Sequence, residues 1–484
     1  MELVPLLVLF FLLINGVLRK PLILILIKNN FLKSNFVLIF FLNFLISQEI
    51  PNEFLEFEKI KMYNDIGKNW NHLTTFGPSR YQNSITQNDS LNIKTKFGTV
   101  FTESNKLIYG YGHFTFKKYF HGYLYLRIVD EPNDFNRFSG IPRDINRGGF
   151  RAGETDISGI TYEKDWMTIQ FGRGRQSWGA SSDIQLAISE NSPSYDYGML
   201  DLDFKNLKVR YFHGYLESDS LRNNRYITGR GIEWKNRKNL LIGLSEVAIY
   251  SGYDRNIDFS YLNPISTHLE IELNQRQNSM GTDGGNGAWQ LSIDYLTSKK
   301  NRLSFNYLFD EFILDKSQSE SGKNHFNAFS IKATQSPFKF ENQALLFYSS
   351  YTMVGKNTFR HEDGNNNFVQ RNKPLGHYMG SDFTILNFGI NWLSEDKSIN
   401  KFEIGKKDIG IYSTTNNPYD PYNYSLDQSF LSQSKIYLKG DSRWWFKKYF
   451  SLIINYEYEY ASKKENNYHL NLGIELYTKL FYSL

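Results

Sequence analysis

The chain has 484 residues, a formal charge of +5 and an aromatic content of 17%, with 33 Tyr, 39 Phe and 8 Trp. A helical membrane protein would need many apolar runs of about 20 residues, and residues after position 48 contain no such run. The absence of cysteine excludes disulfides, thiolate metal sites and a lipid-anchored N-terminal cysteine. Residues 1–48 carry a net +3, so the remainder carries a near-balanced +2, which gives no support for nucleic acid as a partner.

Two apolar stretches open the chain, Leu3–Val17 and Phe36–Ile46. A basic, polar stretch precedes the second, and small Ser47 follows it, which is typical of a Sec signal peptide. We therefore predict an N-terminal extension plus signal peptide over residues 1–47 and one mature domain over residues 48–484. The alternative is that Leu3–Val17 and Pro21–Ile27 form a membrane anchor.

The body of the chain alternates apolar and polar residues in runs of about ten, which is typical of strands with one apolar face. In chain order, clear examples are Trp289–Tyr295, Leu386–Trp392, Leu452–Tyr460 and Tyr468–Leu476, the last two forming a hairpin. A soluble sandwich could show the same alternation. Apolar faces rich in Tyr and Trp, and strands long enough for a tilted bilayer crossing, favour a membrane barrel.

The predicted fold is all-β, a transmembrane antiparallel β-barrel. At about 20–27 residues per strand with its connection, the chain provides roughly 16–20 strands, and an even number is expected. Four long polar stretches are candidate surface loops or lumen inserts: Asp130–Arg151, Asn274–Gly287, Lys356–Met379 and Ser394–Ser432.

Two short motifs resemble catalytic loops only weakly. Gly172–Arg175 lacks the third glycine and the following helix of a phosphate-binding loop. Gly243–Val247 lacks the closing glycine of a nucleophile elbow, and its Ser245 falls within a predicted strand, Leu240–Tyr250. The nine histidines show no metal-ligand spacing. We predict that the protein is not an enzyme and holds no metal or cofactor.

The densest group of polar and aromatic residues lies within Gly172–Asp203, and smaller groups follow it. Planar polar groups that pair with hydroxyls, next to aromatic faces, are typical of sugar sites. The alternative is structural, because a barrel lumen needs paired arginines and carboxylates. The candidates for either role are Arg173, Arg175, Trp178, Asp183, Asn191, Asp196, Arg230, Glu233, Glu246, Tyr250 and Asn263.

We expect the strand before this group to end at Phe171. Gly172 and Gly174 would then turn the backbone and direct Arg173 and Arg175 into the lumen or its mouth. In the structural alternative, both arginines pair with lumen acids such as Glu233 or Glu246.

Several segments resemble, in order, the capsule assembly Wzi family. They are Phe171–Gly179 (FGRGRQSWG), Ser189–Pro193, Phe212–Glu217, Gly229–Trp234, Gly243–Tyr250 and Tyr261–Pro264, with weaker matches at Pro374–His377 and Gly380–Asp382. The Asn- and Lys-rich sequence is similar to Bacteroidetes-type members, which include gliding-motility RemB proteins. The resemblance implies an outer-membrane barrel of about eighteen strands with a lumen blocked by loops or a small plug. The N-terminal residues match poorly, so the helical plug of better-known members is not carried over.

The family further implies a lectin-like, non-enzymatic role, in which the barrel binds or anchors capsular polysaccharide at the cell surface during capsule assembly. The first alternative is an accessory outer-membrane protein of gliding motility or surface-protein secretion, with a protein partner. The second alternative is a diffusion porin, since porins carry facing arginines and acids at a constriction. All three place the chain in the bacterial outer membrane, in contact with its lipid.

Overall fold

The computed structural model describes residues 50–483, except for 68–69, 71–72, 78–90, 104, 118, 133–134, 136, 144–147, 279–283, 299, 312–325, 338, 341–342, 363, 395–396, 416–432, 447–448 and 462–465. The predicted signal peptide and the predicted boundary at residue 48 lie outside the described residues. No helix in the described part of the chain is long and apolar enough to cross a membrane.

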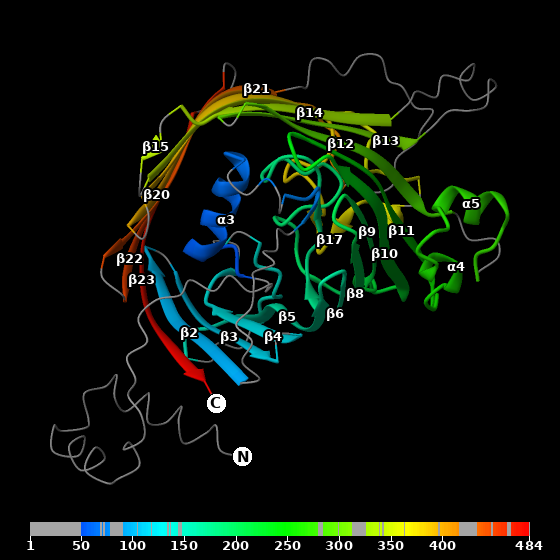
Figure 1. Cartoon of the computed structure of the whole chain (residues 1–484), viewed down its shortest axis with the longest axis horizontal. Helices are drawn as coiled ribbons and strands as arrows, with labels where there is room; N and C mark the ends of the chain where they lie inside the picture. The colour runs from blue at the N-terminus through cyan, green and yellow to red at the C-terminus, as the bar shows by residue number, and fades with distance from the viewer. Residues whose placement is uncertain are drawn as a thin grey trace, which may run out of the picture. The chain divides into compact units, whose positions relative to one another are not determined.

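Within the described residues, eighteen long strands form one closed antiparallel barrel, which confirms the predicted fold class (Figure 1). Consecutive strands pair with each other, and the first pairs with the last to close the ring. The strands are β2 (Leu91–Thr102), β3 (Lys106–Phe116), β4 (Phe120–Val129), β5 (Ala152–Lys164), β6 (Met167–Gly174), β8 (Tyr195–Asp203), β9 (Leu207–Tyr215), β10 (Asn223–Lys235), β11 (Leu240–Tyr253), β12 (Asn286–Ser298), β13 (Asn301–Glu311), β14 (Phe326–Gln335), β16 (Gln343–Val354), β19 (Phe383–Ser394), β20 (Ser398–Ile409), β21 (Gln433–Phe446), β22 (Phe450–Ala461) and β23 (Asn467–Ser483).

The smaller elements lie inside the barrel or on its connections. They are α3 (Leu55–Asp65), α4 (Phe259–Leu262), α5 (His268–Leu273), the 3-10 turn η3 (Gly364–Asn366) and the two-residue strands β1 (Phe76–Gly77), β7 (Ser177–Trp178), β15 (Lys339–Phe340), β17 (Val369–Gln370) and β18 (Lys373–Pro374). Strand β1 pairs with β7, and β17 pairs with β18.

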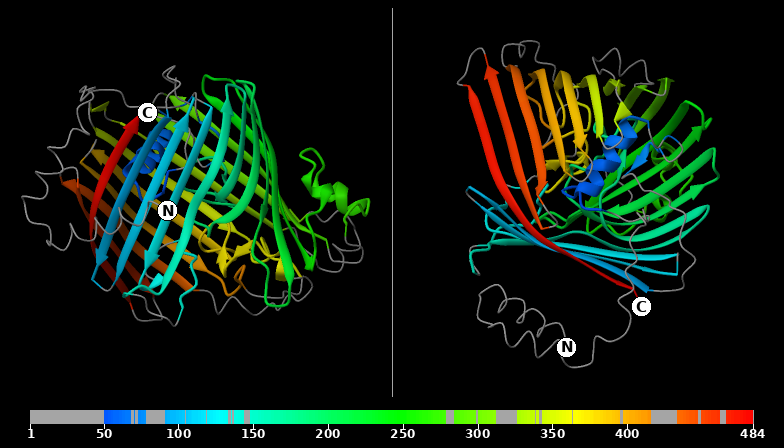
Figure 2. Two further views of the ribbon diagram at one scale, coloured as in Figure 1. Left: turned by 90° about the horizontal axis from the view of Figure 1, so that it is seen from below. Right: turned by 60° about the vertical axis from the view of Figure 1, so that its left-hand side comes forward.

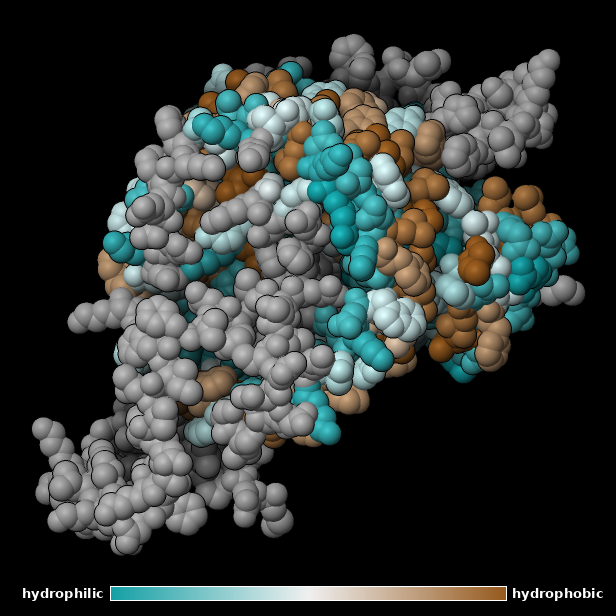
Figure 3. All heavy atoms as spheres, in the orientation of Figure 1, coloured by the Kyte–Doolittle hydropathy of each residue, from teal (hydrophilic) through white to brown (hydrophobic). Residues whose placement is uncertain are grey.

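The outer face of the barrel is apolar, as the sequence alternation predicts. On β23, Leu472 and Ile474 point outward and are 40% and 42% exposed, whereas Glu475 points inward and is 1% exposed. On β19, Phe388 and Trp392 are likewise exposed on the outer face. Figure 3 shows apolar residues on parts of the edge of the molecule. Ser245, the serine of the elbow-like motif, lies within strand β11, as predicted.

The two ends of the barrel differ in their connections. One end holds the start of β2, the end of β23 and the short turns after β3, β5, β8 and β10. The opposite end, here called the long-loop end, holds the long connections after β4, β6, β11 and β16. Asp130–Arg151 and Lys356–Met379 fall in these connections, as predicted, and Asn274–Gly287 does so up to the start of β12.

The prediction of one long loop over Ser394–Ser432 is wrong, because β20 lies within it. The inner face of β20 carries charged side chains, including Lys401, Glu403 and Lys407. These charged residues alternate with the outward-facing Phe402 and Ile404. They make the strand as polar in sequence as a loop.

Three segments fill the lumen, here called together the plug: α3 with residues 73–77, residues 175–194, and residues 355–362 with 364–382 (Figures 1 and 2). Met62 of α3 packs against Leu346 and Leu393 of the wall. The sequence pattern does not predict a helix in this region. Helix α3 lacks a side-chain N-cap, and the residues that it buries include polar Asn64 and Asp65, so its amphipathic pattern is weak.

Candidate functional site

Part of the lumen is a packed apolar core. Phe76, Trp178, Leu186, Phe359 and Phe368 of the plug are buried together with inward residues of strands β8 to β12. Trp178 is 1% exposed and lies between Phe76 and Phe212, with ring centroids 4.9 and 5.2 Å away. A core of this kind excludes water from this side of the lumen.

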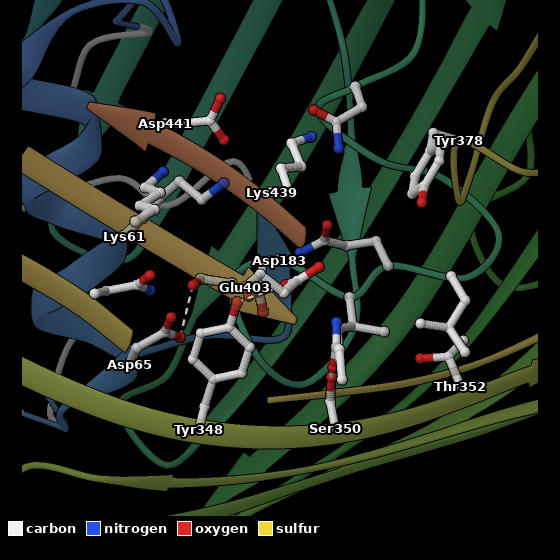
Figure 4. Close-up of a pocket in the computed structure, with 18 of the residues that line it drawn as sticks. Lys61, Asp65, Asp183, Tyr348, Ser350, Thr352, Tyr378, Glu403, Lys439 and Asp441 are labelled. Carbon is white, nitrogen blue, oxygen red and sulfur yellow. Dashed lines mark hydrogen bonds between the residues drawn. The ribbon is translucent and has the colours of Figure 1, made fainter. Parts of the chain in front are cut away.

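Beside this core, the lumen holds a polar cavity of about 290 Å³ (Figure 4). Helix α3 and residues 182–191 form one side, strands β16 and β19–β22 form the other, and His377 and Tyr378 contribute from the third plug segment. Its volume is at the small end of ligand pockets, which span about 300–1,000 Å³. The polar and aromatic residues that line it are Glu58, Lys61, Asp65, Ser182, Asp183, Gln185, Ser189, Asn191, Tyr348, Ser350, Thr352, His377, Tyr378, Asn387, Asn391, Lys401, Glu403, Tyr437, Lys439, Asp441 and Glu457.

Most charges around the cavity are already paired. Lys61 Nζ lies 2.5 Å from Glu190, and Lys332 Nζ lies 2.7 Å from Asp183. Burial alone would lower the pKa of Lys61, but the carboxylates of Glu190 and Glu58 outweigh it and raise that pKa above its usual value. Burial would raise the pKa of Asp183, but Lys332 outweighs it and holds that pKa below its usual range. Lys61 and Asp183 therefore stay charged at neutral pH.

Lys439 differs, because no hydrogen bond or ion pair joins it to any described residue. It extends from β21 into the cavity, and in the view of Figure 4 it lies between Asp441 and Tyr378. The hydroxyl of Tyr437 donates to Glu403 at 2.6 Å, and Tyr348 donates to the same carboxylate. A free ammonium, oriented carboxylates and aromatic faces can together bind a sugar unit through hydroxyl hydrogen bonds and stacking.

The structure brings two of the predicted residues, Asp183 and Asn191, to this cavity. Three others belong to the internal framework. Arg175 is buried and bonds to Asp156 and to the Ser192 carbonyl, Trp178 lies in the apolar core, and Glu233 accepts hydrogen bonds from residues 74 and 75.

The remaining predicted residues lie on the outer wall or on the β11–β12 connection. Arg230 of β10 and Glu246 of β11 are buried on the outer wall beneath helix α5, and Arg230 Nε lies 3.3 Å from Glu246. Tyr250 stacks on Tyr261 of α4 at 4.2 Å. Asn263 follows α4 and donates to Ser266 at 3.0 Å. Both helices project from the side of the barrel (Figure 2).

The predicted turn at Gly172 is wrong, because β6 continues to Gly174. Glycine is needed at position 172 for close strand packing: a Cβ there would collide with the backbone oxygen of Ser158. Because the strand continues, Arg173 shares the outer face with Phe171 and does not enter the lumen. Arg173 pairs with Asp196 at 3.1 Å. The predicted pairing with lumen acids therefore holds for Arg175, but its partner is Asp156, not Glu233 or Glu246.

The cavity residues of the wall were not found from the sequence. Tyr348, Glu403, Tyr437 and Lys439 are inward residues of three different strands. Strict alternation along β16, β20 and β21 could have identified their face, but not which strands meet around one cavity. Among the described residues, no group of three or more His, Asp or Glu could hold a metal ion.

A closed barrel of eighteen antiparallel strands with an apolar exterior is the fold of outer-membrane β-barrels. Among solved structures, the chain is similar to Wzi, "an outer membrane protein involved in group 1 capsule assembly in Escherichia coli", described as a carbohydrate-binding β-barrel. The TM-score is 0.54 and the identity 11%, over 80% of this chain and 84% of that one. Pseudomonas aeruginosa OprD has a TM-score of 0.42 at 8% identity, over 81% of this chain and 95% of that one. No protein-family model and no curated protein matches the chain.

Proposed function

We propose that this protein is a non-enzymatic barrel of the bacterial outer membrane that holds surface polysaccharide at the cell surface. The observation that carries the proposal is a lumen filled by a packed plug, beside which the described residues leave a small cavity lined by polar and aromatic side chains. The shared fold of Wzi, described as carbohydrate-binding, supports the same role.

The orientation follows from the barrel's two ends. Outer-membrane barrels place short turns in the periplasm and longer loops outside. The long-loop end therefore faces the exterior, and the apolar outer belt contacts lipid. Capsular polysaccharide would enter the lumen from this end, and Tyr378 and Lys439, which line the cavity, would contact a sugar unit.

A diffusion porin needs a continuous water-filled path. The apolar core around Trp178, Phe359 and Phe368 disfavours such a path through the part of the lumen that it fills. We therefore expect the purified barrel to show no steady conductance in planar bilayers. Steady porin-like steps would reject the proposal in favour of a porin.

The cellular test is polysaccharide retention. A strain that lacks the protein should release polysaccharide into the medium, and the wild-type gene should restore cell-bound polysaccharide. Lys439→Gln should restore it poorly, because it removes the unpaired ammonium, whereas Lys238→Gln in the exposed β10–β11 turn should restore it fully. Retention must be normalised to folded barrel in the outer membrane. Full retention by the deletion strain would contradict the proposal and favour a role in motility or secretion.

A further inference from the structure

One row of side chains crosses five neighbouring strands on the outer wall at the long-loop end. The register pairs Ser158 with Arg173, Arg173 with Asp196, Asp196 with Tyr215, and Tyr215 with Tyr226. We call these five residues the outer row. Arg173 shares its strand face with Phe171, which is 68% exposed, so the row faces away from the lumen.

A groove of about 410 Å³ follows the outer row, and His213, Gly198 and Ile257 also line it. Gly198 lies on the same face as Asp196, two residues further along β8. A Cβ at Gly198 would come within 3.0 Å of the Phe171 ring. Because Gly198 has no side chain, the outer surface of the barrel is recessed next to Asp196. The groove opens there on the outer surface of the barrel.

The groove combines polar groups with an aromatic face. Arg173 Nε donates to the Thr155 carbonyl at 2.9 Å, which holds the guanidinium against Asp196. The side chain of Asp196 is 63% exposed, and Tyr215 is 42% exposed. The charges of Arg173 and Asp196 cancel, so the site suits the hydroxyls of an uncharged sugar ring that stacks on Tyr215.

The position of the groove identifies the source of that sugar. At the next outward-facing position below the outer row, Ile160 and Phe171 are paired and are 64% and 68% exposed. In a membrane these residues contact acyl chains, and the outer row lies beside the headgroups of the same leaflet. A molecule that carries both a sugar and acyl chains can contact both rows at once, whereas a free polysaccharide can contact only the upper row.

We infer that this groove holds the saccharide headgroup of a glycolipid in the outer leaflet of the membrane. The inference rests on the proposed outer-membrane location, but it concerns a site separate from the lumen cavity. Binding there would fix a lipid against strands β5 to β10, beside the β11–β12 connection, which contributes Ile257.

The test uses the full refolded barrel and glycolipid extracted from the outer membrane of the same cells. Native mass spectrometry gives the apparent Kd. Tyr215→Ala should weaken binding roughly tenfold, because it removes the stacking face. Tyr215→Phe should bind like wild type, and so should the matched control Tyr253→Ala, which removes an exposed tyrosine of β11 outside the groove.

Two further arms identify the ligand. The same lipid without its sugars, and the released polysaccharide without lipid, should each bind the groove at least roughly tenfold more weakly. Unchanged glycolipid binding by both Tyr215→Ala and Asp196→Asn would overturn the inference, as would equal binding of free polysaccharide at this groove. Lys439→Gln should leave glycolipid binding unchanged. The experiment therefore distinguishes a failure of the glycolipid inference from a failure of the proposal that the lumen cavity binds polysaccharide.

Discussion

Replacing Asp294 with alanine should destabilise the barrel strongly, because Asp294 neutralises a buried arginine next to the plug. Arg302 donates to both oxygens of Asp294, from Nε at 2.9 Å and from Nη2 at 2.7 Å. Its contact with Asp65 of α3 is longer, at 3.4 Å. Both partners of the main pair are almost fully buried. Removing one partner of such a pair costs about 3–5 kcal/mol of unfolding free energy.

Asp65→Ala is the matched comparison, and we expect a smaller loss of about 1–2 kcal/mol. Asp65 contacts Arg302 and Lys332 only at 3.4 Å, and each cation keeps a nearer partner, Asp294 or Asp183. The main interaction that Asp65→Ala removes is the hydrogen bond that Ser182 donates to Asp65 at 2.6 Å. Urea unfolding of the refolded barrels, followed by tryptophan fluorescence, measures both values. Equal losses, or a greater loss for Asp65→Ala, would refute this reading of the network.

Three further predictions concern the wall and the plug. Leu472→Arg should block assembly far more than Asn471→Arg, since an arginine facing mid-bilayer lipid costs roughly 2–4 kcal/mol; equal effects on heat-modifiable gel mobility would mean that the register is wrong. Gly172→Ala should impair folding because its Cβ would collide with backbone, whereas Gly112→Ala, with open space around it, should fold normally in the same gel assay; normal folding of both would remove the close-packing argument. Burial lowers the pKa of His377 to about 3, so the folded barrel binds fewer protons than the unfolded chain, and stability that is present above about pH 6.5 is lost as the pH falls towards 3. The free energy of unfolding should thus be about 1–2 kcal/mol lower at pH 5 than at pH 7.5, and a His377→Phe variant with the same pH dependence as wild type would contradict this assignment.

The sequence predicts the wall of this protein better than its interior. Alternation identified the apolar outer face of the closing hairpin, because Leu472 and Ile474 repeat with the period of a strand. The same rule could have placed Arg173 on the outer face with Phe171. The glycines at 172 and 174 instead suggest a turn, although Gly172 allows close packing against β5. Strand β20 was hidden by its charged inner face.

The plug and the cavity depend on contacts that local patterns do not contain. Helix α3 is short, and its stability comes from packing inside the barrel. Asp183 and Asn191 are among the predicted residues because they belong to the dense group of polar and aromatic residues within Gly172–Asp203. Lys439 and Tyr348 were not, because an inward lysine or tyrosine on one strand looks like any other until the closed barrel brings the strands together around the cavity.

The most direct test of the proposed function is binding of the purified, refolded barrel to polysaccharide released from the same cells. Titration with the polysaccharide gives an apparent Kd for the wild-type barrel, which should bind, and for each variant. Lys439→Gln should weaken binding at least roughly tenfold, because a hydrogen bond from a charged group contributes about 1.5–3 kcal/mol, and Lys238→Gln should bind like wild type. No binding by the folded wild-type barrel, or equal binding by Lys439→Gln, would contradict the proposal that this cavity holds the polysaccharide.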